Sequence, residues 1–218
     1  MAATWVMMAT EGPLIAAVIA RMPDPTFNLA AHGVTFALAI LIEAPVIMLM
    51  SAATALVRDR TSFLKLRNFA FALNFLSTAG LLVLLIPSVF NWVTGSLIGL
   101  PAEVSSLTYG ALWFMLPWPG AIGYRRFLQG VLIRAGKTRL VAWGTVIRLI
   151  AMALASLCGF LWLDIPGSWI GAMALGIGVS VEAVAARFMA APTVRGLLDR
   201  KGDLEATGRE ISYRDIAS

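Results

Sequence analysis

The chain has 218 residues, of which 59% are hydrophobic and only 13% are charged, and its mean hydropathy is +0.83. A soluble domain of this size needs more polar surface, so the composition excludes an ordinary globular domain. Continuous apolar runs without alternating polarity favour membrane-spanning helices over a transmembrane barrel. The single Cys158 excludes an intramolecular disulfide and a thiolate metal cluster. We therefore expect an all-α polytopic membrane protein.

Six apolar runs are long enough to cross roughly 30 Å of hydrocarbon as helices. We expect transmembrane helices at about 3–20, 29–57, 67–94, 105–135, 138–163 and 168–192. Together they make one six-helix bundle over residues 1–193, followed by a polar cytoplasmic tail over 194–218. Small residues four apart in the last run favour close helix packing. These pairs are Gly167/Gly171, Ala172/Gly176 and Gly176/Ser180.

Basic residues gather in alternate connections between the runs, within 58–67, 134–139 and 195–201. By the positive-inside rule these connections face the cytoplasm, which places both termini inside and the chain in the cell (inner) membrane. The net charge of +5 is explained by this topology and by anionic headgroups, so we expect no nucleic-acid partner.

Seven ionisable residues fall inside the predicted spans: Glu11, Glu43, Arg125, Arg126, Arg148, Glu182 and Arg187. Each would cost ~2.5–3.5 kcal/mol near the bilayer centre, on the order of 20 kcal/mol together, if all faced lipid unpaired. We expect them to face one another or water. Either they form Glu–Arg pairs that fix helix register, with some arginines reaching the interface, or they line a pathway.

Two of the carboxylates stand two residues before a proline, in Glu11-Gly12-Pro13 and Glu43-Ala44-Pro45. A proline frees the carbonyl four residues earlier, and an interrupted helix beside an acid is one way to build a cation or proton site in a membrane. An ordinary proline kink is the alternative. The ion- or proton-coupling candidates are Glu11, Glu43 and Glu182, with H⁺ or Na⁺ as the coupling ion and no other cofactor.

The fourth run contains Pro117-Trp118-Pro119-Gly120 and then two adjacent arginines. As a straight helix it would span roughly 46 Å, so a break at the prolines is expected. Neighbouring residues diverge by about 100° around a helix, so one of the two arginines should face a cavity. The tryptophans, Trp118 among them, are expected mostly as interface anchors. The substrate-binding candidates are Arg125, Arg126, Arg148 and Arg187.

Several segments in order along the chain resemble one family. They are Glu11-Gly12-Pro13, Ala20-Arg21, Glu43-Ala44-Pro45 leading into Met50-Ser51-Ala52, the run 55–60, Lys65-Leu66-Arg67-Asn68, and 117–126 with Gly130. The chain resembles bacterial relatives of the progressive ankylosis protein, within the multidrug/oligosaccharidyl-lipid/polysaccharide flippase superfamily that includes MATE transporters. The resemblance implies one six-helix repeat of a twelve-helix, alternating-access fold. It also implies export of phosphate-rich or polycarboxylate anions, and Ile211-Ser212-Tyr213-Arg214-Asp215 resembles the lead-in to a second repeat.

The leading hypothesis is a half-transporter that assembles as a parallel homodimer and exports a small anionic metabolite or a lipid-linked anion by secondary active transport. Four interior arginines against three glutamates favour an anion as the substrate. The alternative is a non-transporting membrane subunit, or a separated repeat, that pairs with a different six-helix half. A membrane transferase would need paired carboxylates or metal ligands near one interface, and the acids are instead scattered over three spans. We therefore expect no enzyme, no catalytic residues and no metal.

Overall fold

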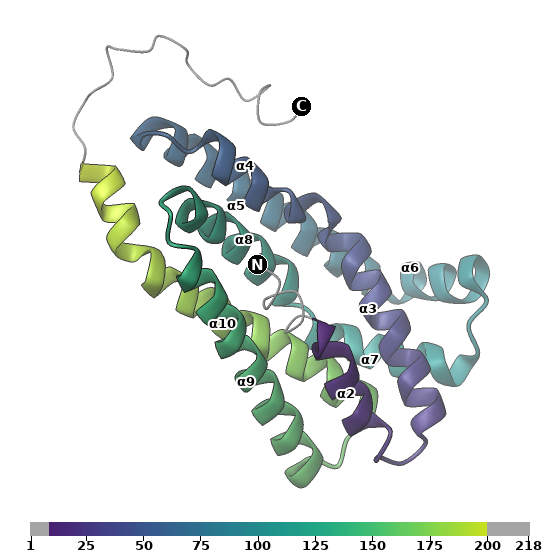
Figure 1. Ribbon diagram of the computed structural model, residues 1–218. Coiled ribbons are helices and arrows are strands. Elements are labelled where there is room, and N and C mark those ends of the chain that lie inside the picture. The colour runs from purple at the N-terminus through teal and green to yellow at the C-terminus, as the bar shows by residue number, and fades with distance from the viewer. Residues whose placement is uncertain (1–8, 200–218) are drawn as a thin grey trace.

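The computed structural model describes residues 9–199, and every element in that part of the chain is helical (Figure 1). The elements are α2 Glu11–Ile19, α3 Pro25–Ile47, α4 Leu49–Leu56, α5 Arg60–Leu84, α6 Pro87–Asn91, the π-helix η1 Trp92–Ile98, α7 Ala102–Phe114, α8 Trp118–Arg134, α9 Thr138–Trp162 and α10 Gly167–Asp199. The expected all-α class is confirmed for these residues.

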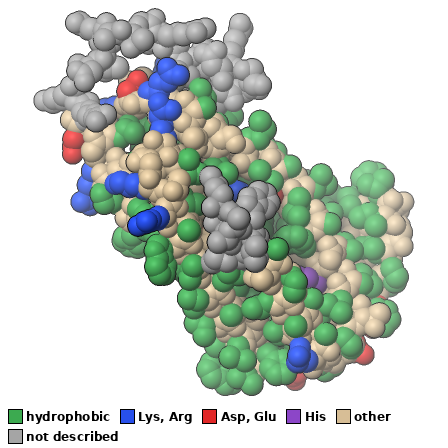
Figure 2. Space-filling view, viewed as in Figure 1, with side chains coloured by type: hydrophobic (Ala, Val, Ile, Leu, Met, Phe, Trp, Pro, Cys, Tyr) green, Lys and Arg blue, Asp and Glu red, His purple; other side chains and the backbone are tan. Residues whose placement is uncertain are grey.

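Four stretches are long and apolar enough to cross a membrane: α3 with α4 over Pro25–Leu56, then α5, α9 and α10. They correspond to four of the six predicted spans. The predicted span 105–135 is instead two shorter helices, α7 and α8, and the predicted span 3–20 begins outside the described residues. Large apolar side chains such as Leu41, Phe75 and Phe188 are more than 70% exposed, as expected where lipid replaces water. Figure 2 shows apolar side chains over much of one face.

Two helix boundaries differ from the prediction for local reasons. Helix α5 begins at Arg60 rather than near 67, because Asp59 and Ser62 cap it reciprocally: Ser62 N donates to Asp59 Oδ1 at 2.7 Å, and Asp59 N donates to Ser62 Oγ at 3.0 Å. Helix α10 continues to Asp199 through Pro192, so the first residues of the predicted tail are helical. The rest of the tail, 200–218, lies outside the described residues.

The basic residues gather at one end of the bundle. There Arg134 Nη1 donates to the carbonyls of Thr54 at 2.9 Å and Ala55 at 3.3 Å, which joins the end of α8 to the end of α4. Lys137 Nζ donates to Thr193 Oγ1 of α10 at 2.9 Å. In Figure 2 most of the visible Lys and Arg side chains lie toward the upper end. The charge asymmetry behind the predicted orientation is therefore present in three dimensions, while the side that faces the cytoplasm stays a prediction.

At the opposite end, α10 begins beside the start of α3. The amide of Ser168 donates to Asn28 Oδ1 at 2.9 Å. Along its length α10 packs closely through glycines, as the small-residue spacing predicted. A Cβ on Gly176 would lie 2.6 Å from the Phe114 carbonyl oxygen, and one on Gly178 would lie 2.2 Å from Met152 Cγ. Only a glycine allows these approaches to α7 and α9.

Two long helices are broken. The chain turns at Met48 between α3 and α4, and again over 115–117 between α7 and α8, which confirms the predicted break at the prolines. The most extensive contact of α3 is with α7, whereas α4 packs chiefly on α8. A Cβ on Gly130 would lie 2.4 Å from the Met50 carbonyl oxygen, and Thr54 Oγ1 donates to the Gly130 carbonyl at 3.4 Å. Helices α4 and α8 are therefore in backbone contact beyond the two breaks.

Candidate functional site

Four helices bring four of the predicted charges into one chain of alternating sign. Arg125 Nη1 of α8 lies 2.7 Å from Glu182 Oε2 of α10, and Arg148 Nε of α9 lies 3.3 Å from the same oxygen. Arg148 Nη2 also pairs with Glu11 Oε1 of α2. The side-chain exposures are 2% for Arg125, 3% for Arg148, 0% for Glu182 and 14% for Glu11. The prediction that interior charges meet one another across helices is confirmed for these four residues.

Gln129 completes the surroundings of Glu182. Its Nε2 donates to Glu182 Oε1 at 3.1 Å, so both carboxylate oxygens of this fully buried residue have partners. The sequence reasoning missed Gln129, which carries no charge and stands in no motif. Its position four residues after Arg125 places both side chains on one face of α8, and that spacing was the available signal.

Glu43 lies in a second, separate polar contact. It is 6% exposed on α3, and Trp118 Nε1, from the first residue of α8, donates to Glu43 Oε2. Trp118 was expected as an interface anchor, but it is 4% exposed and its indole is engaged inside the bundle. That expectation is therefore wrong for Trp118. The prediction that Glu11 and Glu43 face the interior rather than lipid is confirmed by their contacts.

The two prolines beside these acids have different settings. Pro13 lies in the first turn of α2, where a proline removes no hydrogen bond within the helix. Pro45 lies inside α3, and the helix continues to Ile47 before it turns. The interruption expected beside Glu43 therefore follows Pro45 rather than coinciding with it.

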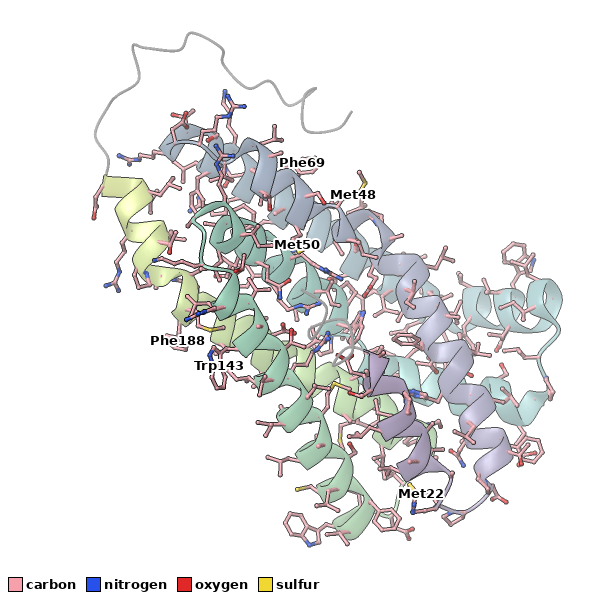
Figure 3. The ribbon with its side chains drawn as sticks, viewed as in Figure 1. Met22, Met48, Met50, Phe69, Trp143 and Phe188 are labelled. Atoms are coloured by element: carbon pink, nitrogen blue, oxygen red, sulfur yellow. The ribbon has the colours of Figure 1, made fainter. Side chains whose placement is uncertain are left out.

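The adjacent arginines of α8 are separated as the helical rotation predicts. Arg125 is buried and paired, whereas Arg126 is half-buried and its closest described polar contact is Nη1 to Met50 Sδ at 3.9 Å. No described carboxylate lies within 4 Å of Arg126; Glu43 attracts it only at longer range. Figure 3 labels Met50 in the upper part of the bundle, where α4 faces α8.

Arg187 does not join the other arginines. Its side chain is exposed on α10, next to Phe188, which points away from the bundle in Figure 3. It lies five residues from Glu182, and 500° of rotation at about 100° per residue puts it on another face of the helix. The interior therefore holds three arginines and three glutamates, and the expected excess of positive charge is absent from it.

The arrangement can do two different things. Glu182, with no exposure and both oxygens bound, holds α8, α9 and α10 together. Glu11 and Arg126 are the more exposed members, so they are the ones that an ion or ligand could reach with least rearrangement. Among residues 9–199, no group of three or more His, Cys, Asp or Glu side chains is placed to hold a metal ion.

Comparison with known proteins adds no relative from which roles could be transferred. No protein-family model matches the chain, and neither the curated proteins nor the solved structures contain a significant match. The likeness to ankylosis-type transporters therefore rests on the motifs alone and stays a prediction.

Proposed function

We propose that this chain takes part in secondary active transport of a small anionic metabolite or a lipid-linked anion across the membrane, by alternating access. Several helices are long and apolar enough to span a bilayer, and they enclose six ionisable side chains. The observation that carries the proposal is Arg126. A guanidinium at membrane depth is costly unless an anion meets it, and no described carboxylate lies within 4 Å of this one.

In this proposal the six interior charges divide the work. Arg126 contacts the anionic group of the substrate, since a guanidinium binds phosphate or carboxylate through paired N–H donors. Glu11 and Glu43 are the coupling residues for H⁺ or Na⁺, because each lies on a helix that borders the arginines. Arg125, Arg148 and Glu182 hold the frame in which these groups face one another.

Assembly belongs to the same proposal. A parallel homodimer, or pairing with a second six-helix half, would enclose a central cavity between two bundles of like orientation. Native mass measured in detergent tests this directly. A monomeric chain that still transports would contradict the need for a second half.

The transport test uses the full chain in liposomes, with inorganic phosphate and citrate as probes. Arg126→Gln is expected to lower uptake at least tenfold, since a charge-assisted hydrogen bond is worth about 1.5–3 kcal/mol. Arg126→Lys should retain part of the uptake, because it keeps the charge and loses the fork. Arg187→Gln is the matched control, an exposed arginine expected to leave uptake unchanged. Equal uptake by Arg126→Gln and the unchanged chain would refute the assignment.

A second candidate function is a non-transporting membrane subunit. The observation that favours it is the complete pairing of Glu182, which is how a purely structural ion network looks. This function predicts no flux of either probe, with or without a partner half, while substitutions in the network still lower the melting temperature.

A further inference from the structure

A groove runs between α2 and α9, away from the charge network. It encloses about 320 Å³, and its lining includes Ala17, Val18, Ala153, Leu157, Phe160 and, at one end, Arg21. Ala17 and Phe160 are exposed, so the groove opens to the outside of the bundle, where the surrounding helices present apolar side chains to lipid. Figure 1 shows α2 in front of the lower part of α9.

The groove exists because α2 is anchored elsewhere. Ile15 and Ile19 are fully buried, and their side chains lie 2.9 Å and 3.0 Å from where a Cβ on Gly171 of α10 would stand. The face of α2 toward α9 carries small side chains instead. Ala17 and Ala153 leave unfilled the space that larger residues would close.

The polarity of the groove is uneven along its length. Ser156 lines it, but its hydroxyl donates to the Met152 carbonyl within α9, so the wall is apolar there. The one charged group in the lining is Arg21, which is exposed just past the end of α2. One of its amino groups donates to the Ala17 carbonyl, and no described carboxylate lies within 4 Å of it. A guanidinium has further donors beyond that one bond.

The charged end of the groove lies where a headgroup would be. Trp162, two residues beyond Phe160 on α9, is 77% exposed at the same end of the bundle, and exposed indoles mark the membrane–water interface. From Leu14 to Arg21 the groove extends about 10 Å along α2, against ~15 Å for half of the hydrocarbon core. It therefore fits the upper part of one acyl chain with an anionic group above it.

We propose that the groove between α2 and α9 binds one glycerophospholipid, with an acyl chain along the apolar wall and its phosphate held by Arg21. Arg–phosphate contacts are commonly bidentate, and this pairing distinguishes the groove from the general lipid-facing surface, which has no cation at its rim. The proposal depends only on the chain lying in a membrane and is independent of transport.

The test measures lipid binding to the purified, delipidated full chain by native mass spectrometry. Dioleoylphosphatidylglycerol is the probe, and dioleoylglycerol, which lacks the phosphate, is its comparison. The unchanged chain should bind one phosphatidylglycerol at least tenfold more tightly than dioleoylglycerol. Arg21→Gln should weaken that binding about tenfold, and Ala153→Phe, which fills the groove, should abolish the preferred site.

Two variants are matched controls: Arg139→Gln, an exposed arginine at the other end, and Ala72→Phe, an exposed alanine on α5. Both should bind as the unchanged chain does. Binding within twofold of the unchanged chain for Arg21→Gln, or equal binding of the two lipids, would overturn the proposal. So would a dimer that Ala153→Phe dissociates without change in lipid binding, because the groove would then be a protein interface. Arg21→Gln disturbs no packing and decides the matter even where Ala153→Phe unfolds.

Discussion

Replacing Glu182 by glutamine keeps the shape of the side chain and removes the charge that Arg125 and Arg148 share. Glu182 has no exposed surface, and its Oε2 lies 2.7 Å from Arg125 Nη1 and 3.3 Å from Arg148 Nε. Two buried guanidinium groups would lose their common counter-charge, and Arg125 would have no other described carboxylate within 4 Å. Breaking a buried pair in this way typically costs 3–5 kcal/mol, because the remaining charge stays buried.

The loss appears as a lower melting temperature. For a chain of 150–250 residues, 1 kcal/mol corresponds to about 2–4 °C, so Glu182→Gln should lower the midpoint by roughly 6–20 °C. The assay follows loss of monodisperse protein, or tryptophan fluorescence, on heating in detergent. Arg187→Gln, an exposed change on the same helix, should stay within about 0.5 kcal/mol. The double variant Glu182→Gln with Arg125→Met should lose less than the sum of the two single changes.

The reasoning is refuted if Glu182→Gln melts within about 2 °C of the unchanged chain, because the network would then contribute no net stability. Additivity in the double variant would refute the direct Arg125–Glu182 coupling while leaving the burial argument in place.

Three further changes test other parts of the structure. Gly130→Ala should destabilise the chain by about 1–3 kcal/mol on melting, since its Cβ would meet the α4 backbone. Gly80→Ala, which meets nothing within 4 Å, should be neutral or stabilising, and a smaller loss for Gly130→Ala than for this control would contradict the packing. Trp118→Phe should cost about 1–3 kcal/mol by leaving Glu43 without its donor, which calorimetry would measure; an unchanged midpoint would show that water replaces the indole. Arg60→Cys should resist an impermeant thiol reagent added outside intact cells, and labelling there would reverse the orientation.

Hydropathy predicted most of the helices because a lipid-facing helix is apolar over about 20 residues, whatever its neighbours are. The start of α5 was missed because the reading weighed hydropathy and not the Asp59–Ser62 cap, which lies in basic, polar sequence. Proline spacing correctly predicted the break before α8. These are local properties, and local sequence carries them.

The partners within the site are tertiary properties. A charge in a span signals that a partner exists, but not which helix supplies it: Arg148 lies between Glu11 and Glu182, which come from opposite ends of the chain. The adjacent pair Arg125 and Arg126 could be divided by helical rotation, but not assigned to inside and outside. Trp118 was misplaced because an indole suits both an interface and a buried hydrogen bond.

The breaks at Met48 and over 115–117 have a mechanical consequence. Because Glu43 of α3 hydrogen-bonds Trp118 of α8, the two breaks lie at a similar level in the bundle. Bending stiffness is lowest where a helix loses its continuous backbone hydrogen bonds, so a thinner or thicker bilayer would be accommodated first by tilt at this level. The α4–α8 block, joined through Gly130, would tilt as one piece. Bilayer thickness would then act on the same layer of the protein that holds Glu43 and the arginines of α8.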